Sequence, residues 1–387
     1  MNGPLVRRWT EARYQWRSGE GWWATLRARC SSLPGRRFVH TEMVAGDGSV
    51  RVTYAGFPEG RTYVVPYLTE LLASLPGEVS VREHAPVSWS WIRERVRQPA
   101  ADAGLLVVGC SRERAHALPA DRALMLPFRV HMLLDVDEGT KTHKSVSPNE
   151  RRQFAKMRRE HEWDCEVGTT EADFDFFYQR MHRPTMELRH GERARSVDRA
   201  IARHSLFHRG VLLFVREAGV RVAGVLCRLD EGGTLLRMRL LGVLDGDETH
   251  YQSGAVKAVY YLAAEWAADN GVRRIDFSGG DPFPAQGVFQ FKRRFRPTIA
   301  QPRDHFGGRR VYLRLGQDSP ALRDLLVRAP LMTVDAAGRL VGTHFADGAR
   351  PARTGVRTDG TGVHSTQVLD LDEFLGTVKE VKEGVLR

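Results

Sequence analysis

The sequence predicts an α/β (α+β) fold in which helices flank a mixed sheet. Strand-like and helix-like patterns alternate from residue 37 to residue 136, which indicates a first α/β domain. Further along, segments 211–216 and 220–229 are rich in β-branched and aliphatic residues. They flank a Glu-Ala-Gly turn, so they predict an antiparallel hairpin. Residues 235–244 predict a third long strand.

The longest helical pattern follows this third strand. Ser253 is a suitable N-cap, apolar residues recur at helical spacing as far as Asn270, and Gly271 suits the position after a helix. A short strand at Arg273–Ser278 comes next, and a Gly- and Pro-rich loop then leads to a final strand at Val288–Phe295. The chain therefore has the order hairpin, strand, capped helix, strand, loop, final strand.

Changes in composition divide the chain into consecutive segments. The predicted segments are a helical lead-in at 1–35, an α/β domain at 36–139, the main domain at 140–305 and a small C-terminal extension at 306–387. The extension begins with a strand at Arg310–Leu315 and contains many Gly, Thr and Asp residues.

The positive charge is concentrated in two segments. The formal net charge is +11. Thr140–Glu160 holds seven basic and two acidic residues, and Pro282–Arg303 holds five basic residues and no acid. The first segment contains a helix that starts at Ser147-Pro148 and carries its basic residues on one side. Such a balance favours a polyanionic partner: nucleic acid, a phosphorylated substrate or an anionic membrane surface. A solvated helix face and a general enrichment in Arg are the alternative explanations.

Several classes of protein are excluded or disfavoured. No secretory signal is recognised, and no segment reaches the roughly 18 uninterrupted apolar residues of a membrane span. The four cysteines are widely separated, which indicates reduced thiols and a cytoplasmic protein. His204 and His208 have the spacing of metal ligands but no third ligand, so no metal is predicted. No nucleotide-binding or nucleophile-elbow motif is found.

Motifs in the main domain carry a resemblance to a known family. They are Tyr261-Leu262-Ala263-Ala264-Glu265-Trp266 with Gly271 and then Ile275-Asp276-Phe277, followed by Gly287-Val288-Phe289 and Phe291-Lys292-Arg293-Arg294-Phe295. Together with the basic helix after Ser147, these residues resemble the Fem-family (FemAB/FemX-like) aminoacyltransferases of the GNAT superfamily. The resemblance covers about residues 140–300. It implies a GNAT-like mixed sheet with splayed central strands, two GNAT-like halves with 36–139 as a degenerate first half, and an appended C-terminal extension.

The resemblance implies transfer of an aminoacyl group from aminoacyl-tRNA, or of an acyl group from a thioester, to an amine. GNAT proteins that use acetyl-CoA hold its pyrophosphate on a Q/R-x-x-G-x-G/A turn. The corresponding place here reads His250-Tyr251-Gln252-Ser253-Gly254-Ala255 and lacks that glycine spacing. An aminoacyl-tRNA donor is therefore favoured, with a small molecule or peptidoglycan precursor as the amine acceptor and no tightly bound cofactor.

Two other functions stay open on the sequence. One is acyl-CoA-dependent N-acylation of a small molecule or a polysaccharide sugar. The other is a non-catalytic, basic RNA-binding protein with a GNAT-like cleft.

Two residues are the candidates for catalysis. By resemblance Lys292 occupies the family's Phe-Lys position, where a cation would neutralise a phosphate or the developing oxyanion. Asp276 lies on the polar side of its strand, where a carboxylate would orient or deprotonate the amine. The alternatives are a solvated basic run for Lys292 and a structural ion pair with Arg273 or Arg274 for Asp276.

The remaining candidates bind substrates. Tyr261 and Glu265 share the face of the long helix predicted to be exposed, from which they could reach the cleft; the alternative is that they only face water. Ser278 and Phe291 are the other two candidates, and the alternative for Phe291 is a core position. The predicted phosphate- or tRNA-binding residues are Arg151, Arg152, Lys156, Arg159, Arg293 and Arg294.

Overall fold

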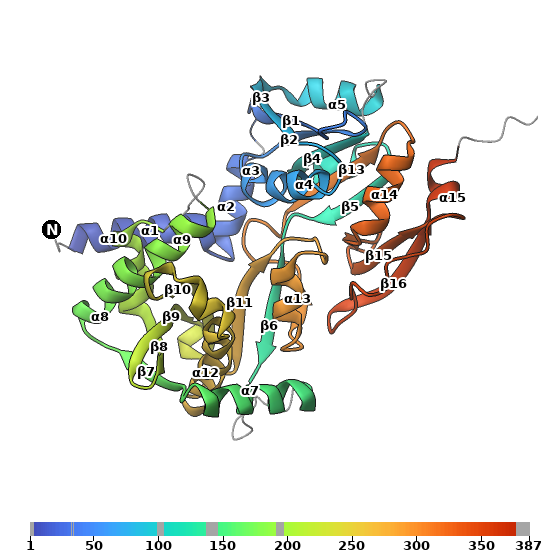
Figure 1. The fold of residues 1–387 in the computed structure, drawn as a ribbon. Coiled ribbons are helices and arrows are strands. Elements are labelled where there is room, and N and C mark those ends of the chain that lie inside the picture. The colour runs from blue at the N-terminus through green and yellow to red at the C-terminus, as the bar shows by residue number, and fades with distance from the viewer. Residues whose placement is uncertain are drawn as a thin grey trace, which may run out of the picture. The chain divides into compact units, whose positions relative to one another are not determined.

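The computed structural model describes residues 4–31, 33, 35–98, 104–136, 146–190 and 197–376. Within it the chain forms two compact units, each made of three segments (Figure 1). Unit 1 comprises Met1–Trp23, His131–Gly279 and Phe291–Ala300, and unit 2 comprises Ala24–Val130, Gly280–Gln290 and Gln301–Arg387. This interleaved arrangement differs from the four consecutive segments predicted from composition.

Unit 1 is built on a seven-stranded sheet with the order β12-β6-β11-β10-β9-β8-β7. These strands are β6 (Val130–Asp135), β7 (Asp164–Gly168), β8 (Gly210–Glu217), β9 (Val220–Asp230), β10 (Leu235–Val243), β11 (Arg274–Gly280) and β12 (Thr298–Ala300). The predicted hairpin is confirmed as the antiparallel pair β8–β9, and β10 pairs antiparallel to β9 as the third strand.

The centre of this sheet is splayed. Strands β10 and β11 are parallel and pair only from Leu235↔Arg274 to Arg237↔Asp276. Beyond that register both strands continue without pairing to each other, β10 as far as Val243 and β11 as far as Gly280. A register shift between Met238 and Leu240 also breaks the pairing of β10 with β9. The mixed sheet with splayed central strands predicted from the sequence is therefore confirmed.

The main helices of unit 1 cover opposite faces of the sheet. On one face lies α12 (Ala255–Asp269), whose Tyr260 packs edge-on against Phe277 of β11 with ring centroids 5.2 Å apart. On the other face Tyr14 of α1 (Pro4–Ser18) joins a core cluster with Phe214 and Leu226 of the sheet. Because successive side chains of a strand alternate between faces, Asp276 points away from α12 toward the face that α1 covers.

The start of α12 differs from the prediction. A short helix, α11 (Glu248–Gln252), precedes it, and Gly254 in the left-handed region (φ 90°) is the N-cap in place of Ser253. The other helical segments of unit 1 are α7 (Pro148–Glu160), α8 (Glu171–Phe176), η2 (Phe177–His182), α9 (Arg183–His190), α10 (Arg199–Ile201), η4 (Ala202–Leu206), η5 (Phe207–Arg209), η6 (Glu231–Gly233) and η7 (Leu244–Gly246). As predicted, Ser147 caps α7, accepting a hydrogen bond from the backbone N–H of Glu150.

The final strand predicted at Val288–Phe295 is a helix, α13 (Gly287–Arg293). Phe291 and Phe295 both pack against Tyr260, with ring centroids 5.1 and 5.5 Å away. A spacing of four residues brings two side chains to the same side in a helical turn. The strand that closes the sheet is the shorter β12, which pairs antiparallel to β6.

Unit 2 contains a six-stranded and a three-stranded sheet. The first has the order β3-β1-β2-β4-β13-β5, from β1 (Phe38–Val44), β2 (Arg51–Gly56), β3 (Ser80–Val87), β4 (Leu105–Ser111), β5 (Ala123–Pro127) and β13 (Arg309–Leu315). The second consists of β14 (Leu331–Val334), β15 (Leu340–Ala346) and β16 (Val363–Asp370). The helices are α3 (Gly60–Tyr63), α4 (Val65–Leu72), α5 (Trp89–Arg97), α6 (Arg112–His116), α14 (Pro320–Arg328) and α15 (Leu371–Leu375), and α2 (Trp22–Ser31) begins in unit 1.

Strand β13 corrects the prediction for the C-terminal segment. It was expected to begin a separate extension, but it lies between β4 and β5 and pairs antiparallel to both. Its side chains Val311, Tyr312 and Leu313 are buried in the main core of unit 2. None of the helices in the described ranges combines the length and hydropathy needed to cross a membrane.

Candidate active site

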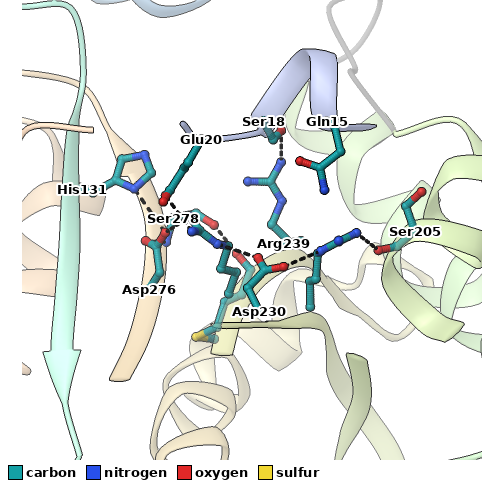
Figure 2. Close-up of polar contacts among 12 residues, drawn as sticks. Gln15, Ser18, Glu20, His131, Ser205, Asp230, Arg239, Asp276 and Ser278 are labelled. Carbon is teal, nitrogen blue, oxygen red and sulfur yellow. Dashed lines mark hydrogen bonds and ion pairs between the residues drawn. The ribbon is translucent and has the colours of Figure 1, made fainter. Parts of the chain in front are cut away.

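Charged side chains gather on the α1 face of unit 1, where β10 and β11 part (Figure 2). They are Glu11 on α1, Glu20 just after it, His131 on β6, Arg228 and Asp230 on β9, Arg237 and Arg239 on β10, and Asp276 on β11. Arg237 contacts Asp276 at 3.2 Å, and Arg239 contacts Ser18 and Tyr14 of α1, so both arginines point to the same side as Asp276. The end of pairing thus coincides with a cluster of ionisable groups.

Ion pairs connect most of this cluster into one network. Arg228 is 2.8 Å from Glu11 and 2.7 Å from Asp230. Arg237 is 2.7 Å from Asp230, 2.6 Å from Glu20 and 3.2 Å from Asp276. Both guanidinium groups are buried, with 5% and 8% of the residue exposed. Each buried charge therefore has at least two opposite partners, the condition under which charged groups are tolerated in a protein interior.

Asp276 and His131 form a hydrogen-bonded pair at the edge of this network. The Nδ1 of His131 lies 3.1 Å from Oδ2 of Asp276, and the backbone N–H of Ser278 donates to Oδ1 at 2.8 Å. Burial acts to raise the pKa of Asp276, but the charge and hydrogen bond of His131, followed by the charges of Arg237 and Arg239, outweigh it. The pKa of the carboxyl is lowered to about 2.

This geometry assigns different chemistry to the two residues. A carboxyl with a pKa near 2 is a weak base, so Asp276 is suited to orienting a partner and not to removing a proton itself. The partner that it orients is the imidazole of His131. In the part of the chain that the structure describes, only Asp276 hydrogen-bonds to the ring, and 12% of the side chain is exposed. A carboxylate that fixes the orientation of an imidazole and stabilises its protonated form is a recurrent catalytic arrangement.

His131 was missed by the sequence analysis. It lies in a strand that was assigned to the first domain, 145 residues before its partner. No local motif marks a single histidine in a strand, and only the pairing of β6 into the sheet of unit 1 brings it to Asp276. The proposed alternative for Asp276, an ion pair with Arg273 or Arg274, is not found, because Arg274 pairs with Asp135 at 2.7 Å.

Ser278 holds the two diverging strands together. Its hydroxyl donates to the backbone carbonyl of Met238 on β10, and its own backbone is in the left-handed region with φ 63°. For a residue other than glycine this conformation costs about 1 kcal/mol or more. The hydroxyl that was predicted to bind substrate therefore has a structural contact at the splay.

Lys292 contacts the same end of β11. It is buried, with 6% exposed, and its Nζ donates to the backbone carbonyl of Phe277 at 2.6 Å and to that of Ser278 at 3.4 Å. The alternative of a solvated basic run is therefore wrong for this residue. Phe291, one residue earlier, packs in the aromatic cluster around Tyr260 and is only partly exposed.

Tyr261 and Glu265 are on the opposite face of the sheet from Asp276. The face of α12 that they share was predicted to be exposed, but helix α7 covers it. Tyr261 is 2% exposed and stacks on Phe154 of α7 with ring centroids 3.8 Å apart. Both oxygens of Glu265 accept hydrogen bonds at 3.0 Å from Arg158 of α7. The structure therefore does not bring these two residues to the His131–Asp276 pair.

The predicted phosphate-binding residues lie on two segments of unit 1. On α7, Arg152, Lys156 and Arg159 are exposed and Arg151 is partly exposed. Lys156 makes a surface ion pair of 3.6 Å with Glu160. After α13, Arg294 is exposed, and Arg293 at the end of the helix is partly exposed. Residues 140–145 of the first basic segment lie outside the described residues.

One known protein family is similar to part of this chain. The model of the acetyltransferase (GNAT) domain family matches residues 144–293. That range contains β7 to β11 with α7 and α12, so it includes the splayed pair β10–β11. This segment is therefore similar to the GNAT acetyltransferase domain, and the similarity covers 150 of the 387 residues. No curated protein matches the chain.

Three solved structures illustrate what the chain resembles. L-PGS from Bacillus licheniformis is 10% identical, with a TM-score of 0.38, 84% of this chain covered and 95% of that one. FemX is 10% identical, with a TM-score of 0.36 and coverage of 69% and 81%. A GCN5-related N-acetyltransferase from Sphaerobacter thermophilus is 13% identical, with a TM-score of 0.32 and coverage of 77% and 87%. At these scores the likenesses carry no conclusion about substrates.

Proposed function

We propose that this protein transfers an acyl or aminoacyl group to an amine, with His131 as the general base. The observation that carries the proposal is the hydrogen bond between His131 and Asp276 at the point where β10 and β11 part. The match of residues 144–293 to a GNAT domain supports acyl transfer as the class of reaction.

The proposed reaction requires only one proton to be moved by the protein. The amine nitrogen attacks the donor's carbonyl carbon, and His131 takes the proton that the nitrogen loses as the new C–N bond forms. Asp276 stabilises the imidazolium. When the C–O bond of an ester donor or the C–S bond of a thioester breaks, the imidazolium returns the proton to the leaving oxygen or sulfur. Because the donor is already activated, positioning of the two substrates supplies much of the rate.

Lys292 has a positioning role in this proposal, because its Nζ is bonded to two carbonyls of β11. We expect Lys292→Met to lower kcat by about 10- to 100-fold, since a misplacement of about 1 Å has effects of that size. Lys292→Arg keeps a cation at the site and should retain more of the activity. Steady-state kinetics on both variants, with their thermal unfolding, provide the test. Full turnover by Lys292→Met would show that Lys292 has no positioning role in the reaction.

Aminoacyl-tRNA is the donor that we favour. The two basic segments come close to each other around Tyr261. The ring of Tyr261 stacks on Phe154 of α7, and the positive charge of Arg294 acts to lower the pKa of its hydroxyl, against the effect of burial. Exposed cations on α7 and beyond α13 therefore belong to one region of unit 1, a pattern expected for a phosphate backbone. The start of α12, where GNAT proteins hold a pyrophosphate, has the side chain of Met157 next to Gly254.

Acyl-CoA is the second candidate donor, because the matching family is one of acetyltransferases. The deciding experiment incubates the purified protein with a mixture of amines. One arm contains tRNA charged with labelled amino acids and the other contains labelled acetyl-CoA. Transfer of label to an amine in the first arm alone supports the favoured donor, and transfer in the second arm alone replaces it. Absence of transfer in both arms contradicts the proposed function with these donors.

The exposed face of α7 gives a further prediction. Replacing Arg152, Lys156 and Arg159 together by Gln should raise KM for charged tRNA and reduce the slope of log KM against log salt by about 2, because each lost phosphate contact contributes about 0.7–0.9. Little change is expected in kcat or in Tm, since these side chains are exposed. Replacing the exposed Arg180, Arg183 and Arg199 by Gln is the matched control. Equal slopes for both triple variants would exclude this face as the tRNA contact.

A further inference from the structure

The three arginines of the charged cluster differ in how their charges are neutralised. Arg228 and Arg237 each contact two or more carboxylates at 2.6 to 3.2 Å. Arg239 contacts none within the described ranges. Its Nη2 donates to the hydroxyl of Ser18 at 2.8 Å, and its guanidinium lies 5.5 Å from the ring centroid of Tyr14. Most of the donors of Arg239 are therefore available to another acceptor.

Arg239 is also accessible and acts on the active site. It is partly exposed, whereas Arg228 and Arg237 are buried. It follows Arg237 by two residues, on the part of β10 that no longer pairs with β11. Its charge contributes to the lowered pKa of Asp276. Figure 2 shows the guanidinium of Arg239 beneath the end of α1, on the same face as Glu20 and the His131–Asp276 pair.

The remaining charges of the cluster have the opposite sign. The four carboxylates of Glu11, Glu20, Asp230 and Asp276 outnumber the three guanidinium groups that they contact, those of Arg209, Arg228 and Arg237. Glu20 and Asp276, the acids at the His131 end, share one partner in Arg237. The site thus has a negative end beside His131 and a positive end at Arg239. A ligand with a positive and a negative group close together would complement both ends.

We propose that the amine acceptor is an α-amino acid, whose carboxylate binds Arg239 and whose amino group lies at His131. This proposal rests on the proposed function and names the acceptor class of that site. A guanidinium and a carboxylate form two parallel N–H···O bonds, which hold the acceptor in a single orientation. The ammonium form of the amine is attracted to Glu20 and Asp276 and releases its first proton to solvent; the neutral amine then gives its second proton to His131 as it attacks the donor.

The test compares acceptors that differ only in the carboxylate. Each standard L-amino acid is paired with its own α-amide, and kcat/KM is measured with whichever donor is active. Wild-type protein should prefer at least one amino acid over its amide by about 10- to 100-fold, the factor expected from a charge-assisted hydrogen bond. Arg239→Gln should remove that preference, so that the variant uses an amino acid and its amide with equal kcat/KM. Arg239→Lys keeps the positive charge but cannot form the two parallel hydrogen bonds of a guanidinium group, so it should restore part of the preference.

The outcomes separate the two proposals. If amides react as well as amino acids in the wild type, or if Arg239→Gln keeps the preference, the acceptor class is wrong and acyl transfer stands. If no amine is acylated, both proposals fail. Should Arg239→Gln unfold, as judged by Tm, the acceptor comparison on wild type and Arg239→Lys still decides. Arg180→Gln, a change to an exposed arginine away from the cluster, serves as the control.

Discussion

His131→Ala is expected to lower kcat for acyl transfer by about 10²- to 10⁴-fold, the usual contribution of a general base. Tm should fall less than in Asp276→Asn, because the Asp276 carboxylate keeps its contacts with Arg237 and the backbone N–H of Ser278 when it loses His131. Single-turnover acyl transfer with the active donor measures the effect on the chemical step.

Imidazole added to the His131→Ala reaction should restore part of the rate, since it can occupy the space of the missing ring beside Asp276. A purely structural role for His131 would not be rescued in this way. His116→Ala, at an exposed position in unit 2, is the control and should behave like the wild type. If His131→Ala retains more than about a tenth of the wild-type kcat, another group must accept the proton.

Asp276→Asn is expected to have the largest effect on stability. It removes a buried carboxylate that is 3.2 Å from Arg237 and 3.1 Å from His131, and so it leaves a buried guanidinium with fewer negative partners. Breaking a buried ion pair from one side costs about 3 kcal/mol. Urea unfolding at neutral pH measures this loss. Activity should fall as far as in His131→Ala, because the imidazole loses the partner that orients it.

The effect of Asp276→Asn should depend on pH. The pKa of Asp276 is lowered from the usual 3.8 to about 2 in the folded protein. The ionised carboxylate therefore stabilises the folded state relative to the unfolded state. Its contribution is complete above pH 4 to 5 and is lost as the pH falls from 3.8 through about 2; it amounts to roughly 2 kcal/mol. The difference in unfolding free energy between wild type and variant should therefore shrink between pH 5 and pH 2. A constant difference across that range would contradict the low pKa.

Periodicity was sufficient for the parts of the fold that local patterns determine. The runs of β-branched and aliphatic residues in β8 and β9, the helical spacing in α12 and the polar position of Asp276 between Ile275 and Phe277 are each set within about fifteen residues, and all were predicted. The prediction of a final strand was wrong because the spacing of Phe289, Phe291 and Phe295 is compatible with either a strand or a helix. Only packing of two of these rings on Tyr260 selects the helix.

The functional cluster required information that local patterns do not contain. His131 meets Asp276 across 145 residues, and Arg228 meets Glu11 across 217. Tyr261 had the spacing of an exposed residue on an isolated helix, and its burial follows from α7, which also neutralises Glu265 through Arg158. Such pairings depend on which strands and helices become neighbours, and a single sequence states that only weakly.

Because the two units are interleaved, a truncated form of this protein has to keep segments that lie far apart in the sequence. A clone limited to residues 144–293 would follow the boundaries of the matching family and would encode Asp276, Arg237 and Lys292. It would omit His131 and β6, which flanks β11 in the sheet. It would also omit Glu11 on α1 and Glu20 just after it, which neutralise the buried arginines. The segment that matches the family model is therefore shorter than the set of segments that supply the residues of the candidate site. Expression libraries, deletion series and domain swaps of this protein need to keep the N-terminal helix and the strand from Val130 onward together with the matched segment.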